Sequence, residues 1–102
     1  MILVDTSVWV SHLRESNAGL QKLLNDGDVL CHNFIIGEIA CDTLRNRAEI
    51  LSLLRTLPRA MEADQEEVLE FIARNHLMGR GLGWVDAHLM ASAFLTGVRI
   101  WT

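Results

Sequence analysis

The first seven residues, Met1–Ser7, read MILVDTS and place one carboxylate where a short apolar run ends. The triplet Ile2–Val4 is typical of a strand covered on both faces of a parallel sheet, although so short a run also fits a buried helix segment. In open α/β sheets, ligands bind at the carboxyl ends of the strands. Asp5 is therefore either a functional carboxylate at a sheet edge or only a cap for the next helix.

The composition is that of one compact domain. The chain has 102 residues, half of them hydrophobic, which is enough for one core and too few for two. No apolar run could span a bilayer and the N-terminus has no secretory signal, so we expect a cytoplasmic protein without membrane contact. Cys31 and Cys41 match no metal-binding spacing and are expected to be buried thiols.

Apolar spacing and capping residues predict strands that alternate with helices, which indicates an α/β fold with a parallel sheet. Strands are expected at residues 2–4, 29–31 and 98–101, with an edge strand at 59–61. Helices are expected at 6–14, 18–25 with Asn17 as cap, 33–44 with Asn33 as cap, 47–55, 64–79 with an Asp64–Glu67 capping box, and 84–95.

Three acids stand in apolar surroundings: Asp5 after the first strand, Glu38 within the apolar segment 34–40, and Asp86 in the first turn of the last helix. Buried carboxylates are unfavourable unless they are paired, hydrogen bonded or bound to a metal. If the three converge, they supply oxygen ligands for Mg²⁺ or Mn²⁺, and such an ion can activate water against a phosphodiester. The acids of residues 62–70 form a charge run that we expect to be solvated.

The net charge of −4 does not favour a protein that binds nucleic acid by being basic overall, but a bound cation would itself attract phosphate.

Asp42, one helical turn after Glu38, is a candidate for support of the carboxylate site. Arg80 lies in a glycine-rich connector, where it can meet RNA phosphate, meet a partner side chain or stay solvated. The histidines show no ligand spacing, and the three tryptophans fit packing better than a base-stacking platform.

Four segments in consistent order resemble PIN-domain proteins, and most closely the VapC-type ribonuclease toxins of bacterial toxin–antitoxin pairs. They are ILVDTSVW at residues 2–9, IGEI at 36–39, GLGWVDAHLMASA at 81–93 and VRIWT at 98–102. The resemblance implies a three-layer α/β/α sandwich around a short parallel sheet. It also implies a metal-dependent endoribonuclease that uses Mg²⁺ or Mn²⁺.

The resemblance places Asp5, Glu38 and Asp86 in the family's catalytic and metal-binding acidic positions. Thr6 or Ser7 takes the hydroxyl position beside the first acid. The implied partners are an RNA substrate, a small antitoxin whose C-terminal segment covers the acidic pocket, and a second copy in a homodimer.

One departure from the family pattern keeps an alternative function open. Family members usually carry a fourth acid after the last Trp-Thr and then a further helix, so we expect a single PIN-like domain over residues 1–102 that lacks both. Without that acid, metal binding would be weaker, and the chain could be a catalytically deficient module that binds an antitoxin or RNA. An aspartate phosphoacceptor is disfavoured because it needs a late lysine, and Lys22 is the one lysine present.

Overall fold

A short parallel sheet of three strands forms the centre of the computed structural model, which describes residues 1–102. Strand β1 (Ile2–Val4) lies between β2 (Val29–Leu30) and β3 (Arg99–Trp101) and pairs in parallel with both. Because β1 has a partner on each side, its carboxyl end is fixed relative to both neighbouring strands. All three predicted strands are confirmed, each within one residue at either end.

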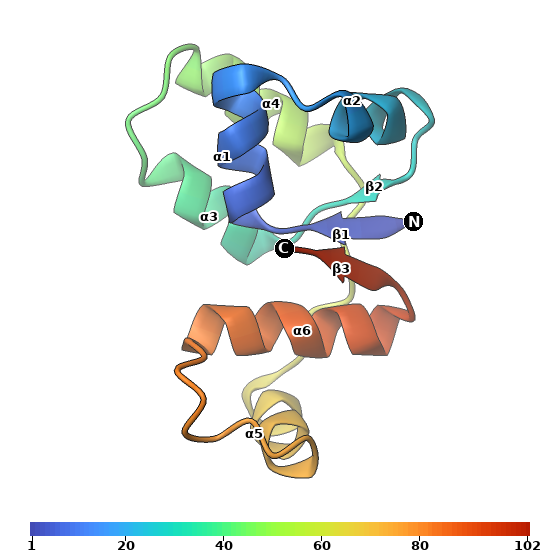
Figure 1. Ribbon diagram of the computed structural model, residues 1–102, viewed down its shortest axis with the longest axis vertical. Coiled ribbons are helices and arrows are strands. Elements are labelled where there is room, and N and C mark those ends of the chain that lie inside the picture. The colour runs from blue at the N-terminus through green and yellow to red at the C-terminus, as the bar shows by residue number, and fades with distance from the viewer.

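Helices cover both faces of this sheet (Figure 1). One face carries α1 (Thr6–Glu15), α2 (Ala18–Asn25), α3 (Asn33–Ala40) and α4 (Arg47–Thr56). The other face is covered by α6 (Trp84–Thr96), and α5 (Gln65–Arg74) packs outside it. The predicted three-layer α/β/α sandwich is confirmed. None of the helices is both long enough and apolar enough to cross a membrane.

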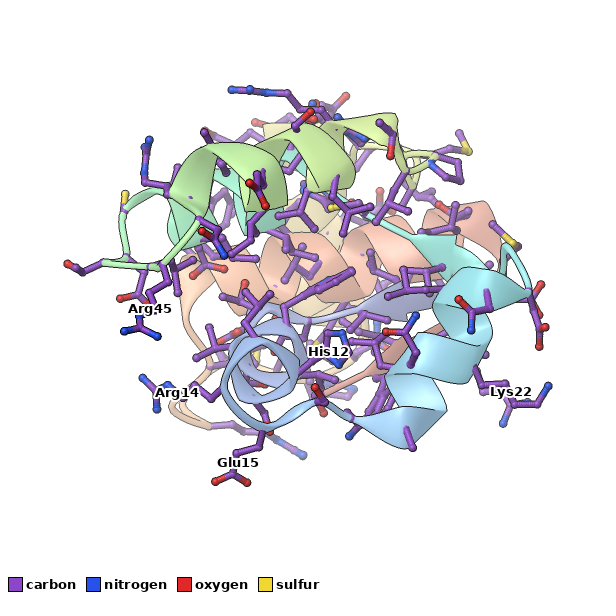
Figure 2. The ribbon with its side chains drawn as sticks, turned by 90° about the horizontal axis from the view of Figure 1, so that it is seen from above. His12, Arg14, Glu15, Lys22 and Arg45 are labelled. Carbon is purple, nitrogen blue, oxygen red and sulfur yellow. The ribbon has the colours of Figure 1, made fainter.

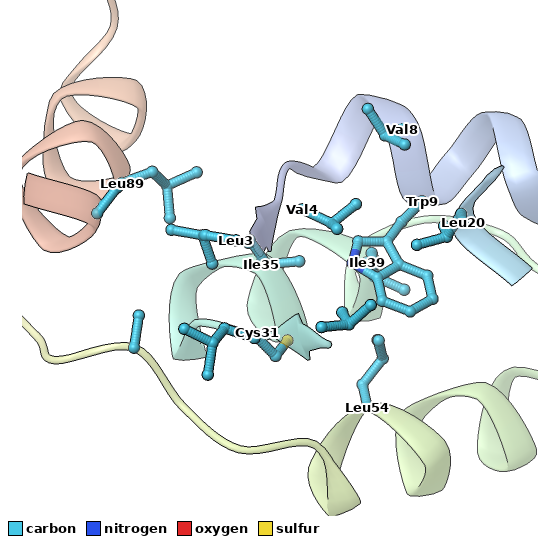
Figure 3. Packing of buried hydrophobic residues seen from close by; sticks show 14 of the residues in the cluster. Leu3, Val4, Val8, Trp9, Leu20, Cys31, Ile35, Ile39, Leu54 and Leu89 are labelled. Carbon is cyan, nitrogen blue, oxygen red and sulfur yellow. The ribbon is translucent and has the colours of Figure 1, made fainter. Parts of the chain in front are cut away.

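The hydrophobic core surrounds β1. Leu3 and Val4 are fully buried, and Figure 3 shows Leu3 extending toward Leu89 of α6. Trp9 of α1 is the largest side chain in this core and is 1% exposed. Burying a Leu or Val side chain contributes about 1.5–3 kcal/mol relative to leaving it in water. Burial from both sides explains why this strand is an unbroken apolar triplet.

Local side chains set several helix ends where the sequence predicts them. The Asn17 side chain accepts a hydrogen bond of 3.0 Å from the Leu20 N–H, which caps α2. Asp64 and Glu67 form the predicted capping box at the start of α5, with hydrogen bonds of 2.8 and 3.0 Å. Helix α6 ends at Gly97, whose φ of 77° lies in the left-handed region that favours glycine.

Helix α3 differs from its prediction at both ends. Its cap is His32 and not Asn33: the His32 Nδ1 accepts from the Phe34 N–H at 2.9 Å, and its Nε2 lies 3.1 Å from Ser92 Oγ on α6. The helix also stops at Ala40 instead of near residue 44. Two guanidinium nitrogens of Arg47 donate to the Ala40 carbonyl, at 3.2 and 3.1 Å, and satisfy one of the free acceptors at this helix end.

Three other expectations were wrong. The predicted edge strand at 59–61 is reduced to one isolated bridge between Cys31 and Arg59. Helix α5 ends at Arg74 and not near residue 79, because the chain turns at His76, whose φ is 52°. Cys31 is a buried thiol as expected, but Cys41 is exposed.

The buried cap residue His32 predicts a pH dependence of folding stability. Burial lowers the pKa of the His32 imidazole from its ordinary 6.5; nearby Glu62 opposes this shift and His88 adds to it. As the pH falls through 6.5, the unfolded chain takes up a proton that the folded chain does not. The contribution of neutral His32 to the free energy of unfolding is therefore fully present above pH 6.5 and is lost as the pH falls below it. Urea unfolding at about pH 7.5 and about pH 5.5 measures this loss.

The control for this prediction is His32→Asn. Asparagine can also cap a helix but does not titrate in this range, so we expect the variant to lose less stability over the same pH interval. An equal loss in both proteins would contradict the assignment to His32.

Candidate functional site

The carboxyl ends of the strands and the first turns of three helices meet at one edge of the sheet. β1 leads into α1 at Asp5, and β2 leads into α3 at His32. Helix α6 runs back along β3, so that its N-terminus lies at the same edge (Figure 1). The N-termini of helices carry partial positive charge, which favours anionic groups at this edge.

Asp5 is both a helix cap and a carboxylate of the site. Its backbone N–H donates to the Trp101 carbonyl at 2.9 Å, which ties it to β3. Its Oδ1 accepts from the Thr6 N–H at 2.7 Å and so caps α1. Its Oδ2 lies 3.5 Å from Ser7 Oγ, at the outer limit of hydrogen bonding. One oxygen of this half-buried carboxylate therefore has no strong hydrogen bond within the chain.

Glu38 is joined to Asp5 through the intervening residue Thr6. The Thr6 hydroxyl donates to Glu38 Oε1 at 2.6 Å, a short bond of the charge-assisted kind. Because Thr6 stands in the first turn of α1 and Glu38 in α3, this contact brings the second acid beside the first.

Asp86 is on α6, across the sheet from Glu38 on α3, and it shares a cavity with Asp5. This cavity of about 370 Å³ is lined by Asp5, Leu82, Asp86, Leu89, Met90, Ile100 and Thr102. Asp86 Oδ2 also accepts from the Gly83 N–H at 3.3 Å, which fixes the start of α6 to the connector before it. The structure thus places the first and third predicted acids on one cavity.

The three acids do not form a ready-made metal cage. No group of three His, Cys, Asp or Glu side chains is close enough to hold a metal ion together. Glu38 and Asp86 are exposed, so the expectation that all three acids are shielded by apolar residues was wrong for these two. The donors nevertheless fit Mg²⁺ or Mn²⁺, since Mg²⁺ is commonly held by one or two carboxylates and completed by water and substrate oxygens. Asp5 and Asp86 meet that requirement.

Asp42 does not join this group. Because α3 ends at Ala40, Asp42 lies beyond the helix and the expected alignment with Glu38 is absent. It lines a separate cavity of about 390 Å³ together with Arg14 and Arg45. Figure 2 shows these two arginines on the same side of the molecule. The Asp42 carboxylate accepts a hydrogen bond from the Thr43 N–H at 2.8 Å.

Arg80 lies in the connector between α5 and α6. Gly79 and Gly81 on either side of it adopt φ values of 76° and 73°. The Arg80 side chain is exposed and makes no hydrogen bond or ion pair within the chain. Its guanidinium is therefore available to a ligand from outside.

An aromatic cluster of Phe34, Trp84 and His88 was not predicted from the sequence. The His88 ring lies 4.7 Å from the ring of Phe34 and 4.7 Å from that of Trp84, edge to face with both. Trp84 packs against His88 but remains 44% exposed, an exposure that the sequence did not predict, whereas Trp9 is buried as expected. The spacing of Trp84 and His88, four residues apart on one helix, was the signal available.

The parallel sheet and its helical layers are those of a PIN domain, and the chain belongs to the PIN-domain family, whose model matches residues 2–102. Over 103 aligned positions it is 46% identical to "Ribonuclease VapC32" of Mycobacterium tuberculosis, in both strain CDC 1551 / Oshkosh and strain ATCC 25618 / H37Rv. The alignment covers 100% of this chain and 83% of each relative. The chain is thus a homologue of a VapC ribonuclease. No solved structure matches it significantly.

The double role of Asp5 predicts different effects for two substitutions on stability. Asp5→Ala removes the α1 cap and should lower the free energy of unfolding by about 0.5–2 kcal/mol. Asp5→Asn keeps a capping oxygen and should change the stability much less. Urea unfolding of both variants measures the difference, and equal losses would show that the cap contributes nothing.

Proposed function

We propose that this chain is a Mg²⁺- or Mn²⁺-dependent endoribonuclease that hydrolyses RNA phosphodiester bonds in the cytoplasm as the toxin of a type II toxin–antitoxin pair. The observation that carries the proposal is the placement of Asp5 and Asp86 on one cavity, with Glu38 tied beside Asp5 through Thr6. Full-length similarity to a protein named as a ribonuclease supports the choice of RNA.

Each residue of the site has a distinct part in this proposal. Asp5 and Asp86, which line one cavity, would hold the cation, and Glu38 would add negative charge nearby. The Thr6 hydroxyl fixes Glu38, and Ser7 is close enough to orient the free oxygen of Asp5. When bound, the cation would offset charge on the phosphate and lower the pKa of water nearby.

The reaction is hydrolysis: a water oxygen bonds to phosphorus while the bond from phosphorus to one ribose oxygen breaks. The attacking water must lose a proton, which a carboxylate at the cavity can accept, and the departing ribose oxygen must gain one, which solvent water can supply. The N-terminal ends of α1, α3 and α6 add partial positive charge where the phosphate lies. Arg80, exposed and unpaired, contributes a bidentate contact to RNA phosphate or to an antitoxin side chain.

The proposed partners are RNA, an antitoxin protein and a second copy of the chain. An antitoxin segment that covers the acidic cavity would block access to the three carboxylates. For the homodimer, exposed apolar side chains beside a hollow of about 280 Å³ between α5 and α6 offer a surface: Phe94 is 72% exposed and Leu95 is 36% exposed.

The first functional prediction is metal-dependent cleavage of a mixed RNA pool. With Mg²⁺ or Mn²⁺ the chain should produce discrete fragments, and a chelator should abolish them. Asp5→Asn should reduce the cleavage rate by at least about a hundredfold while the protein stays folded, since it removes a charged ligand but keeps the helix cap.

Asp64→Asn is the matched control, because Asp64 is also an aspartate that caps a helix and lies away from the cavity. It should cleave RNA at the wild-type rate. Cleavage that survives in Asp5→Asn, or that is lost equally in Asp64→Asn, would contradict the proposed role of Asp5.

The second functional prediction concerns Mn²⁺ affinity, measured by calorimetry without RNA. Glu38→Gln and Asp86→Asn should each weaken Mn²⁺ binding by at least about tenfold, because each removes one negative oxygen donor. Asp42→Asn should leave the affinity unchanged, since Asp42 lines a different cavity. Unchanged binding in both Glu38→Gln and Asp86→Asn would remove the three-acid site from consideration.

The alternative proposal is a PIN-like module over residues 1–102 that binds an antitoxin or RNA without cleaving it. The observation on its side is that the three carboxylates do not lie close enough together to form a metal cage. It predicts RNA or antitoxin binding that is insensitive to Asp5→Asn, with no fragments at any metal concentration.

A further inference from the structure

Both helices that carry an exposed acid of the site also carry an exposed aromatic ring. On α3, Phe34 precedes Glu38 by four residues, so the two share one face of the helix. On α6, Trp84 precedes Asp86 by two residues within the first turn. Phe34 is 37% exposed and Trp84 is 44% exposed. Both rings therefore stand in the first turn of a helix that begins at the proposed catalytic edge.

Buried histidines hold these two rings in place. His88 is 8% exposed and its ring packs edge to face with both, at centroid distances of 4.7 Å. His32, which is 1% exposed, lies 5.1 Å from Phe34. The His32 ring is itself held by Ser92 of α6 at 3.1 Å. The exposed rings are thus fixed in orientation before any ligand arrives.

Trp84 also borders a hollow. A cavity of about 330 Å³ lies between this ring and the connector before α6, with Met78 and Leu82 among its lining residues. Leu82 also lines the cavity of Asp5 and Asp86, so the two hollows adjoin at this residue.

A small aromatic surface of this kind fits a nucleic-acid base better than a protein. Two partly exposed rings supply on the order of 200 Å², well below the roughly 800 Å² that each partner gives to a stable protein interface. Unstacked bases of single-stranded RNA, by contrast, bind to one or two aromatic side chains, and every base offers a π-face.

We propose that Phe34 and Trp84 form a stacking platform for an RNA base next to the bond that is cut. His88 supports both rings from beneath and is a positioning residue. The platform would fix the single strand so that a neighbouring phosphate lies over the cavity of Asp5 and Asp86. This inference rests on the proposed RNA substrate and names how that substrate is held.

The test measures binding separately from cleavage. A short single-stranded RNA of mixed sequence is titrated into the protein in the presence of a chelator, and a ribose-phosphate oligomer of equal length without bases serves as the comparison. Trp84→Ala and Phe34→Ala should each weaken binding of the RNA by about 5- to 150-fold. Neither should change binding of the baseless oligomer. Trp84→Tyr, which keeps an aromatic face, should retain most of the affinity.

Leu53→Ala is the matched control. Leu53 is an apolar residue of α4 that is 45% exposed, almost the same as Trp84, and it lines neither the cavity of Asp5 and Asp86 nor the hollow beside Trp84. This variant should bind RNA like the wild type. As a second readout, RNA should quench more tryptophan fluorescence in the wild type than in Trp84→Tyr, and the difference reports Trp84 because buried Trp9 and half-buried Trp101 are present in both proteins.

Four outcomes bear on the inference. Base-dependent binding that is lost in Trp84→Ala and Phe34→Ala confirms the platform, even if the wild type does not cleave RNA and the proposed nuclease activity fails. Cleavage with unchanged base-dependent binding in both variants refutes the platform and leaves the nuclease intact. Equal loss of RNA and baseless oligomer refutes it too. A change of sedimentation coefficient in Trp84→Ala without a change in RNA binding would assign the surface to a protein contact instead.

Discussion

The pairing of β1 with a strand on each side is the constraint on which the rest of the structure depends. Leu3 and Val4 are fully buried, and the backbone of Ile2–Val4 is paired with both neighbours, so neither a charge nor a turn fits within the strand. Asp5 is the first position at which the chain can leave the sheet. Its carboxylate stands at the edge because the hydrophobic triplet ends there, and its backbone N–H remains tied to Trp101.

Parallel pairing then decides what else reaches this edge. Because the strands run the same way, the helices that follow β1 and β2 both begin where Asp5 lies. Helix α6, which precedes β3, runs antiparallel to that strand and therefore also begins at this edge. Glu38 on α3 and Asp86 on α6 therefore reach this edge from opposite faces of the sheet. The same geometry brings Phe34 and Trp84 together over His88, so the aromatic cluster and the acids have one structural cause.

The sequence predicts those features that depend on neighbouring residues. The caps at Asn17 and Asp64 and the stop at Gly97 are set by side chains or conformations within a few positions, and all three are confirmed. The cap at His32 was missed because its ring is fixed by Ser92, sixty residues later. The exposure of Trp84 was missed for the same reason, since burial is decided by segments distant in sequence. For the candidate site, the choice of these three acids came from the resemblance to a family, because spacing alone does not show which acids converge.

Where a divalent cation binds decides whether the carboxyl edge of the sheet is a metal site. In an NMR titration, trace Mn²⁺ broadens most strongly the amide signals nearest to it. We expect broadening to begin at residues 5–7, 37–39 and 83–87, before it reaches residues 62–70. Broadening that begins instead in the acidic run at residues 62–70 would show that the cation prefers the solvated charges of α5, and would contradict a metal site at the carboxyl edge of the sheet.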